Sequence, residues 1–146
     1  MNVLTSSGAS HLPLDGTTVV DLTRVLAGPV CTQTLGDLGA RVIKVEQPGV
    51  GDDSRAIGPF VDDASAYFMS VNRNKESIAL DLKTTEDRAI FERLLERADV
   101  LVENYRPGTM GKLGYSWAIL KDRFPRLILV SISGFGQTGP YRSQPA

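Results

Sequence analysis

The sequence predicts a doubly wound α/β fold built on a mainly parallel sheet, and three observations support this prediction. Short apolar runs alternate along the chain with segments of helical periodicity, the usual pattern of a parallel sheet with helices on both faces. Of the 146 residues, 42% are hydrophobic and 23% are charged, as in an ordinary globular protein. The length is that of one domain rather than two.

The first half of the chain is predicted to form a strand, a helix, a second strand and a long loop. Residues Thr18 to Leu22 are an apolar run that follows a turn-prone segment. The segment from Gly28 to Ala40 has a proline suited to a first helical turn and apolar residues at helical spacing. Arg41 to Glu46 alternates apolar and charged residues as a strand does, and Gln47 to Asp63 is rich in glycine, proline and aspartate.

The second half continues the alternation of helices and strands. A short helix is predicted over Ala64–Val71, and alternating residues predict a third strand over Ser77–Leu82. Thr84 and the acidic residues after it suit the first turn of a helix that carries Phe91 and Leu95 on its apolar face. The remaining expected elements are a strand over Asp99–Glu103, one or two short helices within Pro107–Lys121, and a strand over Leu127–Ile132.

Charge and residue counts exclude several classes of function. With 16 basic and 17 acidic residues the net charge is -1, so the chain has no overall basic field to hold nucleic acid or an anionic membrane. A single histidine, His11, and a single cysteine, Cys31, cannot supply a Ser-His-Asp triad, an internal disulfide or a His-based metal cluster. Residues 1–12 form a polar leader without the features of a signal peptide, and the cytoplasm is the expected location.

Ligands of open α/β sheets bind beyond the carboxyl ends of the strands, so the residues that follow each strand are the first candidates. After the first strand, Arg24 is followed by small residues that let an anion approach a helix N-terminus. Asn104, Tyr105 and Arg106 follow the fourth strand and could bind an amide edge, stack on a purine and contact a phosphate. Lys83 follows the third strand. The alternative is that Arg24 and Arg106 are solvated and Tyr105 packs on the next helix.

Other charged residues are interpreted as structural. Glu46 has the position of the ribose-binding acid of a dinucleotide site, but Gly28 lacks the partner glycines of that fingerprint, so Glu46 is expected to cap or pair locally. Asp21 is expected to have a polar partner inside the sheet. Asp52 is interpreted as a loop acid, and Lys75, which precedes the third strand, as part of a solvated charged turn or an anion site.

Five separated segments of the chain carry a resemblance to known proteins. They are LDG at 14–16, VVDLTRVLAGPVCTQTLGDLGARVIKVEQPGVGDDSR at 19–55, SVNRNKESIALDLK at 70–83, ADVLVENYRPGTMGKLG at 98–114 and ISGFGQTGPYRSQPA at 132–146. In this order they resemble the amino-terminal part of the class III CoA-transferases, the CaiB/BaiF family. The resemblance is strongest to the formyl-CoA and succinate-hydroxymethylglutarate transferases and weaker to the α-methylacyl-CoA racemases.

This resemblance implies a Rossmann-like CoA-binding domain over residues 13–146, a coenzyme A or acyl-CoA substrate with a carboxylic acid as acceptor, no metal, and an interlocked homodimer. It also assigns CoA contacts to positions on four segments. After the first strand they are Arg24, Leu26 and Ala27, and at the third strand and its end they are Leu80 and Lys83. At the end of the fourth strand they are Asn104, Tyr105 and Arg106, and in the helix that follows it is Lys112. Two departures matter, because Leu26 and Gln47 stand where formyl-CoA transferases have a glutamine and an arginine. Formyl-CoA and oxalate are therefore not expected as substrates.

The family mechanism uses an aspartate that attacks the thioester and forms a mixed anhydride. The resemblance places that aspartate after Ala146, so no residue of this chain is assigned as the catalytic nucleophile, and the chain alone is expected to be inactive. We therefore expect the CoA-binding portion of a class III CoA-transferase, with an incomplete sheet. The alternatives are a non-catalytic CoA- or nucleotide-binding fragment and a racemase-like enzyme.

Overall fold

Five parallel strands form one sheet in the order β5-β2-β1-β6-β7. The computed structural model describes residues 11–144, and the predicted leader lies outside them except for its last two residues. The strands are β1 (Thr18–Asp21), β2 (Arg41–Glu46), β5 (Lys75–Ala79), β6 (Val100–Glu103) and β7 (Ile128–Ser131). The chain builds outward from β1 to β5 on one side and then from β6 to β7 on the other. This doubly wound order confirms the predicted fold class.

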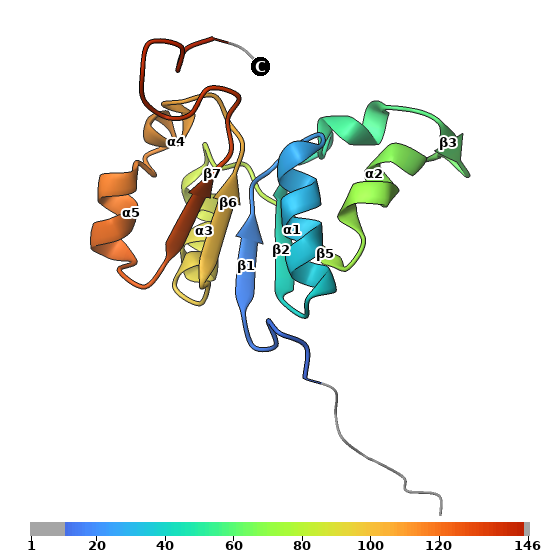
Figure 1. Ribbon diagram of the computed structural model, residues 1–146, viewed down its shortest axis with the longest axis horizontal. Helices are drawn as coiled ribbons and strands as arrows, with labels where there is room; N and C mark the ends of the chain where they lie inside the picture. The colour runs from blue at the N-terminus through green and yellow to red at the C-terminus, as the bar shows by residue number, and fades with distance from the viewer. Residues whose placement is uncertain (1–10, 145–146) are drawn as a thin grey trace, which may run out of the picture.

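Helices cover both faces of the sheet. They are α1 (Ala27–Asp37), α2 (Ala66–Asn72), α3 (Thr85–Leu95), α4 (Thr109–Lys112) and α5 (Trp117–Arg123). Val20 and Leu101 face the larger core together with Phe91 of α3 and Leu120 of α5, whereas Val19 faces the smaller core on the α1 side. Figure 1 shows α2 at the β5 end of the sheet and α4 and α5 at the β7 end.

The long loop predicted over Gln47–Asp63 contains short ordered elements. A 3-10 turn, η1, spans Asp53–Ala56, and β3 (Phe60–Val61) pairs antiparallel with β4 (Ala64–Ser65). The prediction of a helix over Ala64–Val71 was wrong at its start, because Ala64 and Ser65 form β4. The Ser65 hydroxyl accepts from the Phe68 amide as the N-cap of α2.

The third strand also differs from its prediction. The alternating run Ser77–Leu82 predicted a strand there, but β5 spans Lys75–Ala79. Its last paired residue, Ala79, lies opposite Glu46, where β2 ends. Leu80 and Leu82 continue the apolar alternation because they are buried in the larger core beyond the end of the sheet. The alternation of apolar residues therefore indicates which residues are buried. The hydrogen-bonded pairing of β5 stops earlier, because its partner β2 ends at Glu46.

Local sequence explains the best-defined boundaries. The Thr84 hydroxyl accepts from the Asp87 amide at 3.3 Å and caps α3, as the sequence predicted. Gly28, in the first turn of α1, is packed so closely on β1 that a Cβ there would lie 2.3 Å from Thr23 Cβ. This close approach brings the start of α1 directly against the end of β1. Within residues 11–144 no helix has the length and apolar character needed to cross a bilayer.

Candidate functional site

The carboxyl ends of β1, β2 and β6 and the segment after β5 lie together at one edge of the sheet. We call this the strand-end rim, and it consists of residues 22–27, 46–56, 80–83 and 103–106. The order of the strands reverses between β1 and β6, since β2 lies on one side of β1 and β6 on the other. In open α/β sheets this switch point is where ligands bind.

Several pockets open on the rim, and two of them are called the smaller and the larger pocket. The smaller, of about 190 Å³, is bounded by Arg24 after β1, Leu80 and Lys83 after β5, and Tyr105 after β6. The larger, of about 460 Å³, lies toward β7 and is bounded by Arg106, Met110 and Trp117. Whole-ligand sites usually occupy ~300–1,000 Å³, so the smaller pocket suits one part of a long ligand.

Four of the residues predicted from the sequence meet at the smaller pocket. Leu80 is buried and forms its apolar wall, whereas Lys83 is exposed and Arg24 is about 38% exposed at the side chain. Tyr105 is partly buried, packs against the larger core and also lines this pocket. Burial raises the pKa of its phenol. A pocket lined by two cationic side chains and an apolar wall suits a ligand that has phosphates at one end and a ring at the other.

The other predicted residues lie around these pockets. Leu26 and Ala27 are exposed at the start of α1, next to Arg24, and Lys112 is exposed at the end of α4. Asn104 is turned toward the protein, because its Oδ1 accepts from the Arg24 amide and its Nδ2 donates to the Arg24 carbonyl, both at 2.8 Å. The amide of Asn104 therefore joins the ends of β1 and β6 across the switch point.

A set of charged side chains lies within the rim and beneath it, and sequence reasoning interpreted some of them differently. We call Asp21, Lys44, Glu46, Asp52, Arg55 and Lys75 the charged network. Lys44 and Asp52 form an ion pair of 2.8 Å in which each side chain is only 1% exposed. Lys75 lies 3.1 Å from Asp21, and these side chains are 2% and 0% exposed. The interpretation of Lys75 as a solvated turn residue was wrong. Asp52 does lie in the loop after β2, as interpreted, but it is buried and paired with Lys44.

Asp21 is held by four donors. Its carboxylate accepts from the amide and hydroxyl of Thr23, at 2.8 and 2.5 Å, and from the Thr32 hydroxyl at 2.6 Å, in addition to Lys75. The prediction that Asp21 has polar partners inside the sheet is therefore confirmed. Burial lowers the pKa of Lys75, and the charge of Asp21 opposes that effect.

Glu46 ties the loop after β2 to the sheet. Its carboxylate accepts two hydrogen bonds from Arg55, of 2.6 and 2.7 Å, one from Ser77 and one from the Asp52 amide. Burial opposes ionisation of Glu46, but these donors outweigh it and lower its pKa to about 2. The expected local pairing of Glu46 is confirmed. Because a bidentate guanidinium saturates this carboxylate, Glu46 acts as an anchor of the loop.

Part of this network could have been predicted from the sequence. Lys44 lies in a strand predicted next to the first one, and a strand inside a parallel sheet is buried on both faces. A lysine in such a strand needs a buried acid as partner. The identity of that acid depends on how the loop folds back, which residue spacing does not reveal.

Comparisons with known proteins identify relatives over nearly the whole chain. The model of CoA-transferase family III matches residues 14–146. The acetyl-CoA:oxalate CoA-transferase of Acetobacter aceti is 58% identical over 134 residues, covering 92% of this chain and 34% of that protein. The human succinyl-CoA:glutarate CoA-transferase is 52% identical over 129 residues, covering 88% and 30%.

A solved structure agrees with these sequence matches. The crystal structure of a CAIB/BAIF family protein from Brucella suis has a TM-score of 0.87 and 48% identity, covering 92% of this chain and 37% of that chain. The chain thus spans about a third of the length of the curated relatives it matches.

Proposed function

The chain belongs to CoA-transferase family III, and from this membership we propose that it binds the CoA part of an acyl-CoA at the strand-end rim. In the complete enzyme the CoA is then moved to a carboxylic acid. The observation that carries the proposal is the meeting of Arg24, Lys83 and Tyr105 at one pocket on the switch point of the sheet.

The chemistry of the rim fits the two ends of CoA. Phosphate groups are bound well by arginine and lysine side chains, and Arg24 and Lys83 both line the smaller pocket. Leu80 and Tyr105 give that pocket an apolar wall for a flat or aliphatic group. We propose that Leu26, Ala27, Asn104, Arg106 and Lys112 extend this surface around the pocket, as the family resemblance implies.

The buried carboxylates of the charged network suit a structural role better than covalent catalysis. Asp21 and Glu46 each accept several hydrogen bonds, and Asp52 is paired with Lys44. A carboxylate that attacks a thioester needs a free lone pair in front of the carbonyl carbon. We therefore propose that this chain binds and orients CoA, and that an aspartate of the complete enzyme outside this segment is the nucleophile. The interlocked homodimer and the cytoplasmic location stay predictions.

The acceptor proposed is a small dicarboxylic acid. The names of two relatives include oxalate and glutarate, which are both dicarboxylates. Leu26 argues against oxalate by comparison with formyl-CoA transferases, but the relative that is 58% identical to this chain is named for oxalate. We propose that oxalate and glutarate belong in the same substrate panel. A panel of oxalate, succinate, glutarate and acetate, assayed with full-length enzyme, should show exchange with the diacids and little with acetate.

Calorimetric titration of the purified chain with CoA tests the binding proposal. We expect saturable one-to-one binding, with weaker binding of dephospho-CoA, which lacks the 3′-phosphate, and weaker still of pantetheine, which lacks the nucleotide and every phosphate. Dephospho-CoA and pantetheine also discriminate a CoA site from a general anion site. If CoA does not bind to folded protein at millimolar concentration, or if inorganic phosphate competes as well as CoA does, the proposed function is wrong.

A further inference from the structure

Three side chains from other parts of the molecule hold the backbone of the turn that joins β1 to α1. Lys44 Nζ donates to the Thr23 carbonyl at 2.7 Å. Asn104 binds both the amide and the carbonyl of Arg24. Asp52 Oδ1 accepts from the Val25 amide at 3.1 Å. Thr23, Arg24 and Val25 are therefore each tied by a side chain from β2, from the end of β6 or from the loop before η1.

Val25 has a backbone conformation that its residue type disfavours. Its φ of 67° lies in the left-handed region, which is unfavourable for a side chain branched at Cβ. Val25 is 37% exposed, so it is not enclosed in either core of the sheet. The conformation is therefore maintained by the hydrogen bonds to the backbone of the turn.

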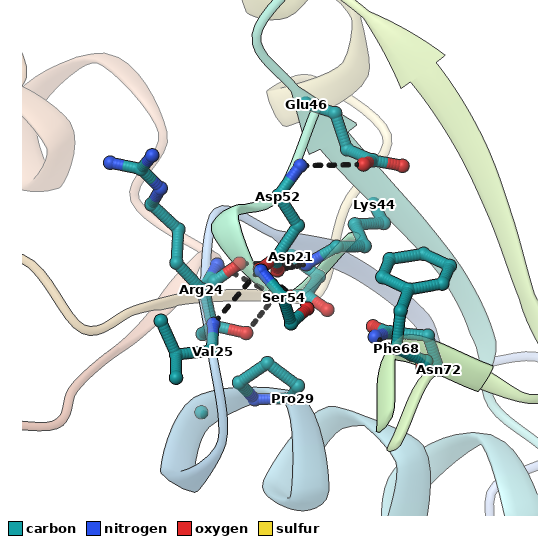
Figure 2. A network of polar contacts seen from close by, with 12 residues as sticks. Asp21, Arg24, Val25, Pro29, Lys44, Glu46, Asp52, Ser54, Phe68 and Asn72 are labelled. Carbon is teal, nitrogen blue, oxygen red and sulfur yellow. Dashed lines mark hydrogen bonds and ion pairs between the residues drawn. The ribbon is translucent and has the colours of Figure 1, made fainter. Parts of the chain in front are cut away.

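Asp52 is well placed to provide that restraint. Figure 2 shows Asp52 lying among Val25, Lys44 and Ser54, with dashed contacts joining the group. Its Oδ2 pairs with Lys44, and its Oδ1 accepts from Val25 and from both the amide and the hydroxyl of Ser54. Because Lys44 is buried in β2, the sheet fixes the position of the carboxylate that binds the turn.

We propose that Asp52 is a positioning residue for the ligand site. Paired with Lys44, it keeps Val25 left-handed and so directs the next two residues, Leu26 and Ala27, at the exposed start of α1. This inference rests on the proposed function, because it takes CoA to be the ligand that contacts this turn. Asp52 itself acts through the backbone and does not touch the ligand.

Two nearly isosteric double variants separate the restraint from the buried charge. Lys44→Met with Asp52→Asn removes both charges but keeps a side-chain oxygen for the Val25 amide. Lys44→Met with Asp52→Leu removes that oxygen as well. Neither variant leaves an unpaired charge in the interior. Both variants also lose the hydrogen bond from Lys44 to the Thr23 carbonyl, so they are compared with each other. We expect the second to bind CoA at least ~tenfold more weakly than the first, since one lost hydrogen bond can shift affinity by that much.

Hydrogen exchange of the Val25 amide gives a readout that does not require CoA. We expect protection in the unmodified chain and in the asparagine variant, and fast exchange in the leucine variant. Protection that persists in the leucine variant overturns the positioning role, whatever the affinity for CoA. If CoA binds none of the three proteins while Val25 exchange changes as expected, the proposed function fails and the restraint on the turn stands.

Two substitutions at Val25 test the proposal further, the first when the leucine variant does not fold and the second when it does. Val25→Pro removes the amide donor and imposes a negative φ, and because Val25 is exposed the fold should survive. We expect at least a tenfold loss of CoA affinity. Val25→Asn, a residue that tolerates the left-handed region, should restore binding when added to the leucine variant. CoA binding by Val25→Pro that equals that of the unmodified chain would overturn the proposal, as would the absence of any rescue by asparagine.

Discussion

Most side chains of the charged network are buried and paired, whereas the cations Lys83 and Arg106 of the strand-end rim are exposed. Lys44 and Lys75 are almost inaccessible and each faces an aspartate, while Lys83 and Arg106 extend into solvent from the ends of two segments. Buried pairs fix the shape of the loops, because an unpaired charge in the interior is very unfavourable. Exposed cations contribute little to stability and are free to meet an anionic ligand. The two groups should therefore respond differently to substitution.

The largest expected effect follows from breaking a buried pair. Asp21→Ala leaves the ammonium group of Lys75 buried without its carboxylate, and we expect the free energy of unfolding to fall by about 3–5 kcal/mol. Urea denaturation followed by circular dichroism measures this change. The matched control is Glu76→Ala at the exposed pair with Arg41, where we expect a loss of no more than ~1 kcal/mol. Equal losses in the two variants would refute the contrast.

Lowering the pH should reduce the stability that the buried carboxylates of the charged network contribute. The pKa values of Glu46 and Asp52 are both lowered to about 2 in the folded chain, from 4.5 and 3.8. Their contribution to stability is complete above the unfolded pKa values and is lost as pH falls from about 5 to 2. We expect a loss on the order of 2 kcal/mol for each group, measured by urea unfolding across this range. In Glu46→Gln the dependence should be shallower, and an unchanged slope would contradict the assignment.

Removing an exposed cation should weaken CoA binding and leave the stability of the fold almost unchanged. For Lys83→Ala and Arg106→Ala we expect unfolding free energies within ~0.5 kcal/mol of the unmodified chain. The affinity for CoA should fall about tenfold in each, because a charge-assisted hydrogen bond contributes ~1.5–3 kcal/mol. Calorimetric titration and urea unfolding, made on the same preparations, give both values. Two stable variants with unchanged affinity would remove these residues from the proposed site.

The smallest effect is expected at the boundary between the two groups. Arg24 is partly exposed and its Nη2 lies 2.5 Å from Asp53, which competes with any anion for the guanidinium. Asp53→Asn should therefore strengthen CoA binding by a few-fold at low salt and less at high salt. Calorimetry at two ionic strengths checks this expectation. A loss of affinity would mean that Asp53 orients Arg24 for the ligand.

Local pattern was enough to predict much of the fold. The second strand, Arg41–Glu46, was predicted with its observed bounds, and the Thr84 cap fixed the start of α3. The third strand was displaced because alternation reports burial rather than pairing, and Leu80 and Leu82 are buried beyond the sheet. The two-residue strands β3 and β4 were missed because they carry too few residues for a periodic signal.

The candidate site was predictable in position more than in detail. Residues after the first, third and fourth strands were selected because carboxyl ends of parallel strands share an edge, and Arg24, Lys83 and Tyr105 do meet there. Pairing between segments was not visible in the sequence. Asp52 and Lys44 lie eight positions apart, and the turn of the loop between them decides that they meet. The inward direction of Asn104 likewise depends on the approach of β1 to β6.

Titration of isotope-labelled chain with CoA, followed by amide nuclear magnetic resonance, tests the central claim most directly. We expect the largest shift changes at the amides of Arg24, Lys83 and Tyr105, with smaller changes along the start of α1. The opposite edge of the sheet, around Ala98 and Leu127, serves as the internal reference and should stay unchanged. Saturable shifts concentrated at that opposite edge, with none at the strand-end rim, would contradict the claim that CoA binds where the parallel strands end.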